Sequence, residues 1–273
     1  MVNPRNLRVA GLVGVALTLA IVAGACVGDA GRTPRIVFIT LPPNPTSPAG
    51  SGGTPAPTAA PATFSELLVT STAPDGRWTV TFKKPLVSGL PDTVGTKIND
   101  AITRQVNDYI SAFTGQKLPA VAKDASPSQL QGDYAVAYNS SAVISLRFTA
   151  IAMVSGAESS VGTPGSLNFQ TSTGKEIALS DLFADPTSAT ATIAAKTHSA
   201  LASTLGTELT WDGKASSLDF FSGAWAIAAD GLEFSWPQGK IASAAGGMPS
   251  AKVPWADLRS LLKPGSPVAS LAG

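Results

Sequence analysis

A single cysteine, Cys26, limits the ways in which this chain can be stabilised. One cysteine cannot form an intramolecular disulfide, and the single histidine, His198, leaves too few ligands for a structural zinc site built from Cys and His. The sequence therefore predicts a fold held by a hydrophobic core, with no metal and no cofactor. At 273 residues, 44% of them hydrophobic, the chain is long enough for one large domain or two small ones.

Residues 1–26 have the composition of an export signal. Arg5 and Arg8 precede an uncharged, mostly apolar run, and small residues lead up to Cys26. This ending resembles the lipobox of bacterial lipoproteins, in which the cysteine becomes the lipidated N-terminus after cleavage, although Ala23 stands where leucine is usual. The alternative is an uncleaved signal anchor, because about 20 uncharged residues can span a bilayer. Both interpretations predict a protein anchored to the cytoplasmic membrane, with its bulk outside it.

Residues 27–64 are rich in Pro, Gly, Ser and Thr and poor in large apolar side chains. Such a segment buries too little surface to offset the entropy of ordering, so we expect a disordered tether between the membrane and the folded part. Charged residues make up only 14% of the chain, and the formal net charge is +1. Since Lys and Arg form no run or patch, the sequence argues against a nucleic-acid ligand.

The first predicted subdomain covers residues 65–164. A β-hairpin is expected where the apolar stretches 67–69 and 78–82 flank the turn residues Pro74-Asp75-Gly76. A second hairpin is expected over residues 133–153, followed by a flexible loop up to Gly165. Between the hairpins, apolar residues recur every three or four positions, which predicts an amphipathic helix that ends at Gly115. These residues are Val94, Ile98, Ile102, Val106, Ile110 and Phe113.

The second predicted subdomain covers residues 165–264, followed by a tail at 265–273. It opens with a hairpin over Gly165–Phe183, in which Leu182 and Phe183 are expected to be buried anchors. Next come an Ala-rich helix over 189–205, a hairpin over 225–236 around Asp230-Gly231, and a short strand and helix over 251–262. The predicted fold class is α+β: antiparallel sheets with helices packed on one face, in two coupled α/β subdomains.

Several segments of the second subdomain resemble the RsiV-type extracytoplasmic domain. They are the Leu-Asn-Phe strand at 167–169, the Thr-Gly-Lys turn at 173–175, Ile-Ala-Leu-Ser-Asp-Leu-Phe at 177–183, the hairpin at 226–236, and 253–258. The family includes the outer part of a lysozyme-binding membrane anti-sigma factor, domains fused to peptidoglycan deacetylases, and secreted mycobacterial proteins. The resemblance covers Leu67 to Leu262 and implies an envelope module that binds a ligand or protein. Relatives often have His after Gly156-Ala157, whereas Glu158 stands here.

The residue types needed for catalysis are scarce, and no catalytic residue is predicted. His198 lies at the edge of a helical apolar stripe, and no Gly-x-Ser-x-Gly motif occurs. Three carboxylates are candidates by position. Asp181 fits the chemistry of a turn and helix start, and Glu233 is expected on the exposed face of its strand. Glu158, in the flexible loop, has no evident structural role.

The candidate ligand-binding region therefore consists of the loop residues Gly156, Ala157 and Glu158, together with Trp211 and Trp236, which border loops and are expected to be exposed. The favoured function is a non-enzymatic binding module on the cell envelope, whose partner is a lysozyme-like protein or a cell-wall polymer. The alternative is a secreted esterase-type hydrolase acting on envelope lipids or acylated glycans, with a serine assisted by His198 or a carboxylate.

Overall fold

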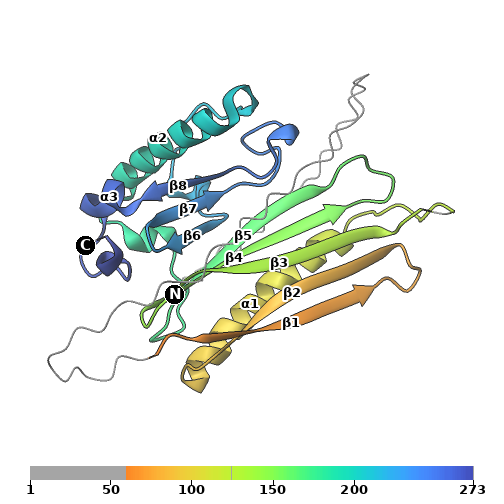
Figure 1. The fold of residues 1–273 in the computed structure, drawn as a ribbon, viewed down its shortest axis with the longest axis horizontal. Helices are drawn as coiled ribbons and strands as arrows, with labels where there is room; N and C mark the ends of the chain where they lie inside the picture. The colour runs from red at the N-terminus through yellow and green to blue at the C-terminus, as the bar shows by residue number, and fades with distance from the viewer. Residues whose placement is uncertain (1–59, 124, 273) are drawn as a thin grey trace, which may run out of the picture. The chain divides into compact units, whose positions relative to one another are not determined.

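The computed structural model describes residues 60–123 and 125–272 (Figure 1). The predicted signal segment, Cys26 and most of the predicted tether lie outside these residues. The chain from Pro57 onward forms one compact unit. In the part that the structure describes, no helix combines the length and the apolar character needed to cross a membrane.

The larger sheet has five strands in the spatial order β1-β2-β3-β4-β5. The strands are β1 (Thr63–Thr72), β2 (Trp78–Ser88), β3 (Ser128–Asn139), β4 (Val143–Met153) and β5 (Val161–Gln170). β1 and β2 form the first predicted hairpin, and β3 and β4 form the second. Both hairpin predictions are confirmed, and β1 begins two residues before the predicted start at Ser65.

β2 and β3 are parallel, so this sheet is not purely antiparallel. Their pairing runs from Trp78 opposite Ser128 to Phe82 opposite Gly132. Parallel neighbours need a crossover connection, and helix α1 (Asp92–Thr114) provides it. The predicted helix thus determines how the two hairpins join.

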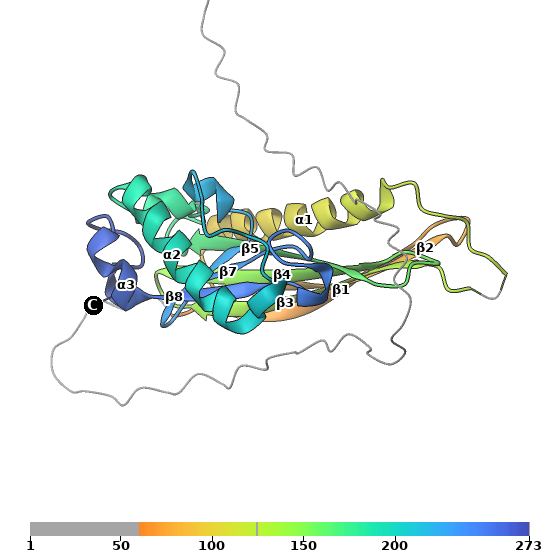
Figure 2. The ribbon, with the colours of Figure 1, turned by 90° about the horizontal axis from the view of Figure 1, so that it is seen from above.

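Helix α1 buries its apolar stripe against one face of the larger sheet, and Figure 2 shows the helix lying along the strands. Val94, Ile98, Ile102, Val106 and Phe113 are all at most 6% exposed, as the spacing predicts. They form the first hydrophobic core with strand residues that include Phe82, Leu146 and Phe148. Asn99 also fixes the helix to β2, because its side-chain amide pairs with both backbone groups of Val87 at 2.9 Å.

β5 is longer than the sequence suggests, and the loop before it is shorter. Residues 161–165 were expected in the flexible loop, but they pair with β4. The expected division between residues 164 and 165 therefore falls inside this strand. The expected second arm of the central hairpin is reduced to one bridge, between Phe169 and Glu176, before a short 3₁₀ helix, η1 (Leu179–Leu182).

The smaller sheet is antiparallel, in the order β6-β7-β8. Its strands are β6 (Trp225–Ala228), β7 (Gly231–Ser235) and β8 (Ser250–Pro254), and the helices beside it are α2 (Pro186–Leu205) and α3 (Trp255–Leu258). The remaining short 3₁₀ helices are Gly206–Glu208, Leu218–Phe220, Ala244–Gly246, Arg259–Leu261 and Ala269–Leu271. The predicted helix, hairpin and closing strand are all present, which confirms the α+β class.

A second hydrophobic core joins this sheet to α2 and to the anchors that follow β5. Leu182 and Phe183 are 0% and 3% exposed, as predicted. The core also reaches into the predicted tail, where Val268 is fully buried. A register shift in β3 between Val136 and Tyr138 separates the two cores, because Val136 packs on the first and Tyr138 on the second.

Candidate functional site

The predicted loop lies between β4 and β5. Gly156, Ala157 and Glu158 are exposed, and Gly156 has a φ of 81°, a conformation that favours glycine. The loop is fixed at its start, where the Ser155 N–H donates to Ser128 Oγ at 3.0 Å. Glu158 has no ion pair among the described residues. The loop is exposed as predicted, but its side chains do not converge on the two tryptophans.

The tryptophans belong to an aromatic cluster made by Trp211, Phe220, Phe221, Phe234 and Trp236. Trp211 stacks on Phe220 with ring centroids 5.0 Å apart, and lies 6.1 Å from Trp236. The expectation that Trp236 is exposed is wrong, because this side chain is only 4% exposed. Trp236 continues the alternation of β7 on the same side as Phe234, which faces the second core. Trp211 is half-buried, and its indole N–H donates to the Lys214 carbonyl at 2.7 Å.

Among the described residues, Gln238 and Gly162 form hydrogen bonds close to the two predicted regions. Gln238, two residues after Trp236, donates its N–H to the Gly162 carbonyl at 3.1 Å, and its side-chain oxygen accepts from the Gly162 N–H at 3.3 Å. The Met248 side chain occupies the space that a Cβ at residue 162 would need, which glycine leaves free. These contacts fasten the start of β5 to the segment that follows Trp236.

His198 packs against the aromatic cluster. Its ring makes an edge contact with Trp211 at a centroid distance of 5.6 Å, and Gly213 lies so near that a Cβ there would come within 2.9 Å of the imidazole. Within the described part of the chain, His198 makes no hydrogen bond and no ion pair. The same part contains no group of three or more His, Cys, Asp or Glu side chains placed to hold a metal ion.

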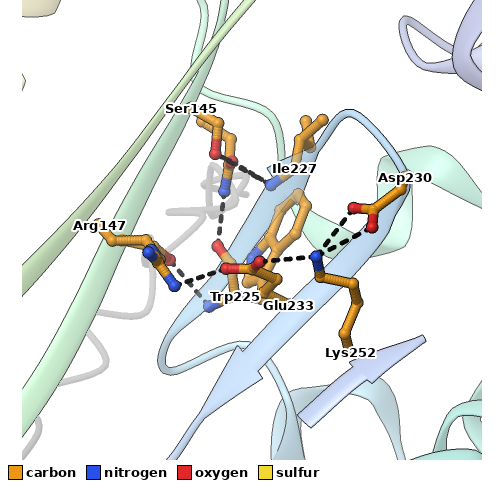
Figure 3. Close-up of polar contacts among 9 residues, drawn as sticks. Ser145, Arg147, Trp225, Ile227, Asp230, Glu233 and Lys252 are labelled. Atoms are coloured by element: carbon orange, nitrogen blue, oxygen red, sulfur yellow. Dashed lines mark hydrogen bonds and ion pairs between the residues drawn. The ribbon is translucent and has the colours of Figure 1, made fainter. Parts of the chain in front are cut away.

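A polar seam, formed by Ser145, Ser166 and Asn168, joins the two sheets. Figure 3 shows Ser145 beside Ile227 and Trp225. β6 is an edge strand of the smaller sheet, and its free backbone groups face β4 and β5 of the larger one. The hydroxyl of Ser145 accepts from the Ile227 N–H, and Asn168 donates to the Trp225 carbonyl, both at 2.9 Å. Ser166 Oγ accepts from the Trp225 N–H at 2.9 Å. The seam therefore satisfies an edge that would otherwise be buried unpaired.

Beside the seam, Arg147 and Glu233 form an ion pair at 2.5 Å, and Lys252 bridges Glu233 and Asp230 (Figure 3). The Glu233 side chain is only 16% exposed, so its expected place on an exposed strand face is wrong. Partial burial lowers the pKa of Lys252, but its hydrogen bonds to Asp230 and Glu233 raise that pKa overall, and Lys252 stays charged. This network links the two sheets, and each of its four charged side chains is paired with an opposite charge.

The outer edge of β1 is unpaired among the described residues. All ten residues of β1 pair with β2 on one side, in unbroken register. Leu67 and Leu68 are 43% and 61% exposed. The strand contains no Pro, Lys or Arg, and its one charged residue is Glu66. Edge strands of natural proteins usually have a bulge, a proline or a lysine that blocks pairing, and β1 has none of these.

Two clefts lie on the surface of the larger sheet and α1. The Trp78 cleft has a volume of about 290 Å³ and is lined by residues 73–75, 77, 78, 114 and 116. The second cleft, about 260 Å³, is lined by Lys97, Arg104 and Glu176 among others. Desolvation of the carboxyl group raises the pKa of Glu176, and the charge of Arg104 opposes this shift.

No local sequence pattern indicates the seam, the β1 edge or the clefts. Ser145 and Asn168 are ordinary polar residues of alternating strands, and alternation does not tell which face a second sheet covers. The lack of Pro and Lys in residues 63–72 was visible, but only the strand order shows that this segment is an edge.

Comparison with known proteins identifies a fold. No protein-family model matches the chain, and no curated protein sequence matches it. Solved structures, in contrast, match most of the chain. A DUF3298 family protein from Bacteroides fragilis superposes with a TM-score of 0.56 at 12% identity, over 78% of this chain and 98% of that one. A DUF3298 family protein from Pseudomonas aeruginosa gives a TM-score of 0.56 at 15% identity, over 76% of this chain and 97% of the other. The described part of this chain thus has the fold seen in DUF3298 structures.

Proposed function

We propose that this chain is an extracytoplasmic binding module that captures a protein partner by pairing with the free edge of β1. A lipid on Cys26, or an uncleaved signal anchor, holds it at the membrane, and the part of the predicted tether that precedes β1 links this anchor to the folded unit. The resemblance to RsiV-type domains suggests a lysozyme-like protein as the first partner to test. A cell-wall polymer is the other class of ligand to test beside it.

The unprotected edge of β1 supports this proposal most directly. An extended segment of a partner gains main-chain hydrogen bonds along such an edge and side-chain contacts on both faces. The exposed Leu67 and Leu68 lie in the middle of the strand, where an added strand covers both. Burial of their apolar surface by the partner contributes roughly 25 cal/mol per Å² to the free energy of binding.

The placement of the reactive side chains supports binding over hydrolysis. His198 lies against Trp211 and Gly213, and none of the described contacts joins it to a serine or a carboxylate. Arg147 and Glu233 hold the two sheets together. The esterase alternative has no supporting geometry in the described residues.

Retention of lysozyme and of purified cell-wall material by the immobilised compact unit, residues 57–273, tests the proposal. We expect Leu68→Lys to weaken protein binding at least about tenfold, because a charge on the edge blocks strand addition. Met153→Lys is the matched control, since Met153 is 50% exposed but lies on β4. Equal binding of lysozyme by both variants, or retention of wall material without retention of lysozyme, contradicts capture of a protein at this edge.

A further inference from the structure

The Trp78 cleft lies between the turn that joins β1 to β2 and the C-terminal end of α1. Its walls are well fixed. In the turn, the Ala73 N–H donates to the Trp78 carbonyl at 3.0 Å and the Gly76 N–H to the Ala73 carbonyl at 2.9 Å. The cleft is therefore part of the folded framework, and a ligand finds it already formed.

Trp78 gives this cleft an aromatic wall. Its side chain is half-buried and packs against the first core, so the indole is held in place while part of it faces the cleft. Pro74 adds a second apolar surface nearby. A rigid indole offers a large, flat contact area at little cost in side-chain entropy.

Asp75 and Arg77 supply paired charges to the same cleft. Asp75 accepts hydrogen bonds from the Arg77 Nε at 2.6 Å and from the Arg77 backbone N–H at 3.2 Å. The side-chain hydrogen bond from Arg77 is the main cause that lowers the pKa of Asp75, so the carboxylate stays ionised. The two charges cancel, but unused guanidinium N–H groups and carboxylate lone pairs remain for a ligand.

Two neutral groups from the end of α1 complete the lining. Gln116 donates its side-chain N–H to the Ala112 carbonyl at 3.0 Å, which orients the amide. Its side-chain oxygen and the Thr114 hydroxyl have no hydrogen-bond partner among the described residues. The cleft therefore offers one flat apolar wall and, around it, donors and acceptors with almost no net charge.

From this arrangement we infer that the Trp78 cleft binds a neutral saccharide. A pyranose ring has an apolar face of C–H groups that fits an indole, and a rim of hydroxyls that both donate and accept hydrogen bonds. A purely apolar ligand would leave Asp75 and Arg77 desolvated without new partners, and an anion would meet the carboxylate of Asp75. This inference goes beyond the proposed capture of a protein at β1, since it names a second ligand and a separate site.

Titration of residues 57–273 with the tetramer of N-acetylglucosamine tests the inference, with the tetramer of glucose as a second arm. Isothermal calorimetry is expected to show saturable binding of at least one oligomer. We expect Trp78→Ala to raise its dissociation constant at least about tenfold, or about 1.4 kcal/mol. The oligomer that binds more tightly shows whether the cleft prefers an N-acetylated or an unmodified sugar.

Gln116→Ala removes a cleft acceptor without touching the core, so it keeps the test valid where Trp78→Ala fails to fold. Gln131→Ala is its matched control, because Gln131 is exposed on β3 outside the cleft. We expect weaker binding by Gln116→Ala only, and full saccharide binding by Leu68→Lys. No saturable binding of either oligomer, or binding that neither Trp78→Ala nor Gln116→Ala weakens, overturns the inference while leaving the β1 proposal untouched.

Discussion

Tyr109 illustrates how a single residue shapes the first core. Its ring stacks on Phe82 at a centroid distance of 5.7 Å, and its hydroxyl is buried with no hydrogen-bond partner. Burial raises the pKa of Tyr109, so the hydroxyl stays protonated. The hydroxyl fills the space where a side chain at residue 165 would begin, which explains why β5 has Gly165 there.

We expect Tyr109→Phe to keep or raise the free energy of unfolding, by up to about 1–2 kcal/mol, because it removes an unsatisfied buried hydroxyl. Gly165→Ala is expected to lower it by about 1–3 kcal/mol through overpacking. The double variant should recover part of that loss. Urea unfolding measures all three, with Tyr134→Phe as the control, and a double variant less stable than Gly165→Ala would contradict the packing account.

Local sequence alone did not reveal the surroundings of Trp236 and Glu233. The alternation of residues 232–236 correctly predicts a strand, and it places Phe234 and Trp236 on one face. What it omits is that Phe220 and Phe221 cover Trp236, and that Arg147 approaches Glu233 from the other sheet. Both contacts join residues far apart in the chain, so no local pattern encodes them.

At the scale of elements, helix α2 shows a terminus that the sequence does specify. Asp185 is its N-cap: the carboxylate accepts from the Thr187 N–H at 2.9 Å and from the Ser188 hydroxyl at 2.6 Å. Pro186 follows in the first turn, where its missing N–H is harmless. The hydrogen bond from Ser188, followed by that from Thr187, lowers the pKa of Asp185 below its ordinary value of 3.8.

A lowered pKa in the folded state means that the stabilisation by Asp185 is complete above its unfolded pKa and is lost as pH falls through the folded one. We therefore expect Asp185→Ala to lower the urea midpoint at neutral pH, and this difference from the parent to stay constant down to about pH 4 and to shrink at lower pH. Asp185→Asn keeps a capping oxygen without the charge. Its advantage over Asp185→Ala should not change with pH; a pH-dependent advantage would show that another group is titrating.

The edge of β6 depends on side chains from another sheet. We expect Asn168→Ala to lower the free energy of unfolding by about 1–3 kcal/mol, because the Trp225 carbonyl loses its donor in a buried place. Ser145→Ala should have a smaller effect, because the Ile227 N–H keeps Asn168 Oδ1 as a second acceptor at 3.3 Å. Thr149→Ala, on the same strand and outside the seam, serves as the control. If chemical unfolding gave the same free energy of unfolding for all three variants, this role of the seam would be contradicted.

Elements with a strong internal period were predictable, whereas those set by contacts were not. The stripe from Val94 to Phe113 fixes α1 because one face alone is apolar. Pro164 and Gly165 look like loop residues, yet they lie in β5, where an edge position tolerates proline. The side chains that occupy the space of a Cβ at residues 162 and 165, Met248 and Tyr109, are distant in sequence.

For the whole molecule, two hydrophobic cores lie within one compact unit. Because the seam and the Arg147–Glu233 pair connect them, we expect both cores to unfold in a single transition. Phe82→Ala in the first core and Phe234→Ala in the second should each destabilise by about 3–5 kcal/mol and shift the same midpoint.

Two spectroscopic signals check this expectation. Four of the five tryptophans lie after residue 200, so fluorescence reports mainly on the second core, whereas far-ultraviolet circular dichroism reports on both. Coincident curves for the parent and both variants support a single transition. Separate midpoints in the parent would show that the cores are independent domains.

The sequence predicts the α+β class and most elements, since turn residues and periods recur along both halves. It does not predict how the halves meet. Residues such as Ser145 and Ser166 gain their role only when β6 lies against them. The Trp78 cleft likewise combines a turn with the end of a helix that lies after β2 in the chain.

The parallel pairing of β2 with β3 has a consequence for the order of events during folding. β1 and β2 pair through a short turn, whereas α1 separates β2 from β3 in the chain, so their pairing closes a much longer loop. Before β3 pairs with β2, the hairpin of β1 and β2 has two unpaired strand edges. It also exposes the apolar face that α1 covers in the native structure. Non-local closure of this kind is slow, so this interval is when incompletely folded chains are most prone to associate with one another.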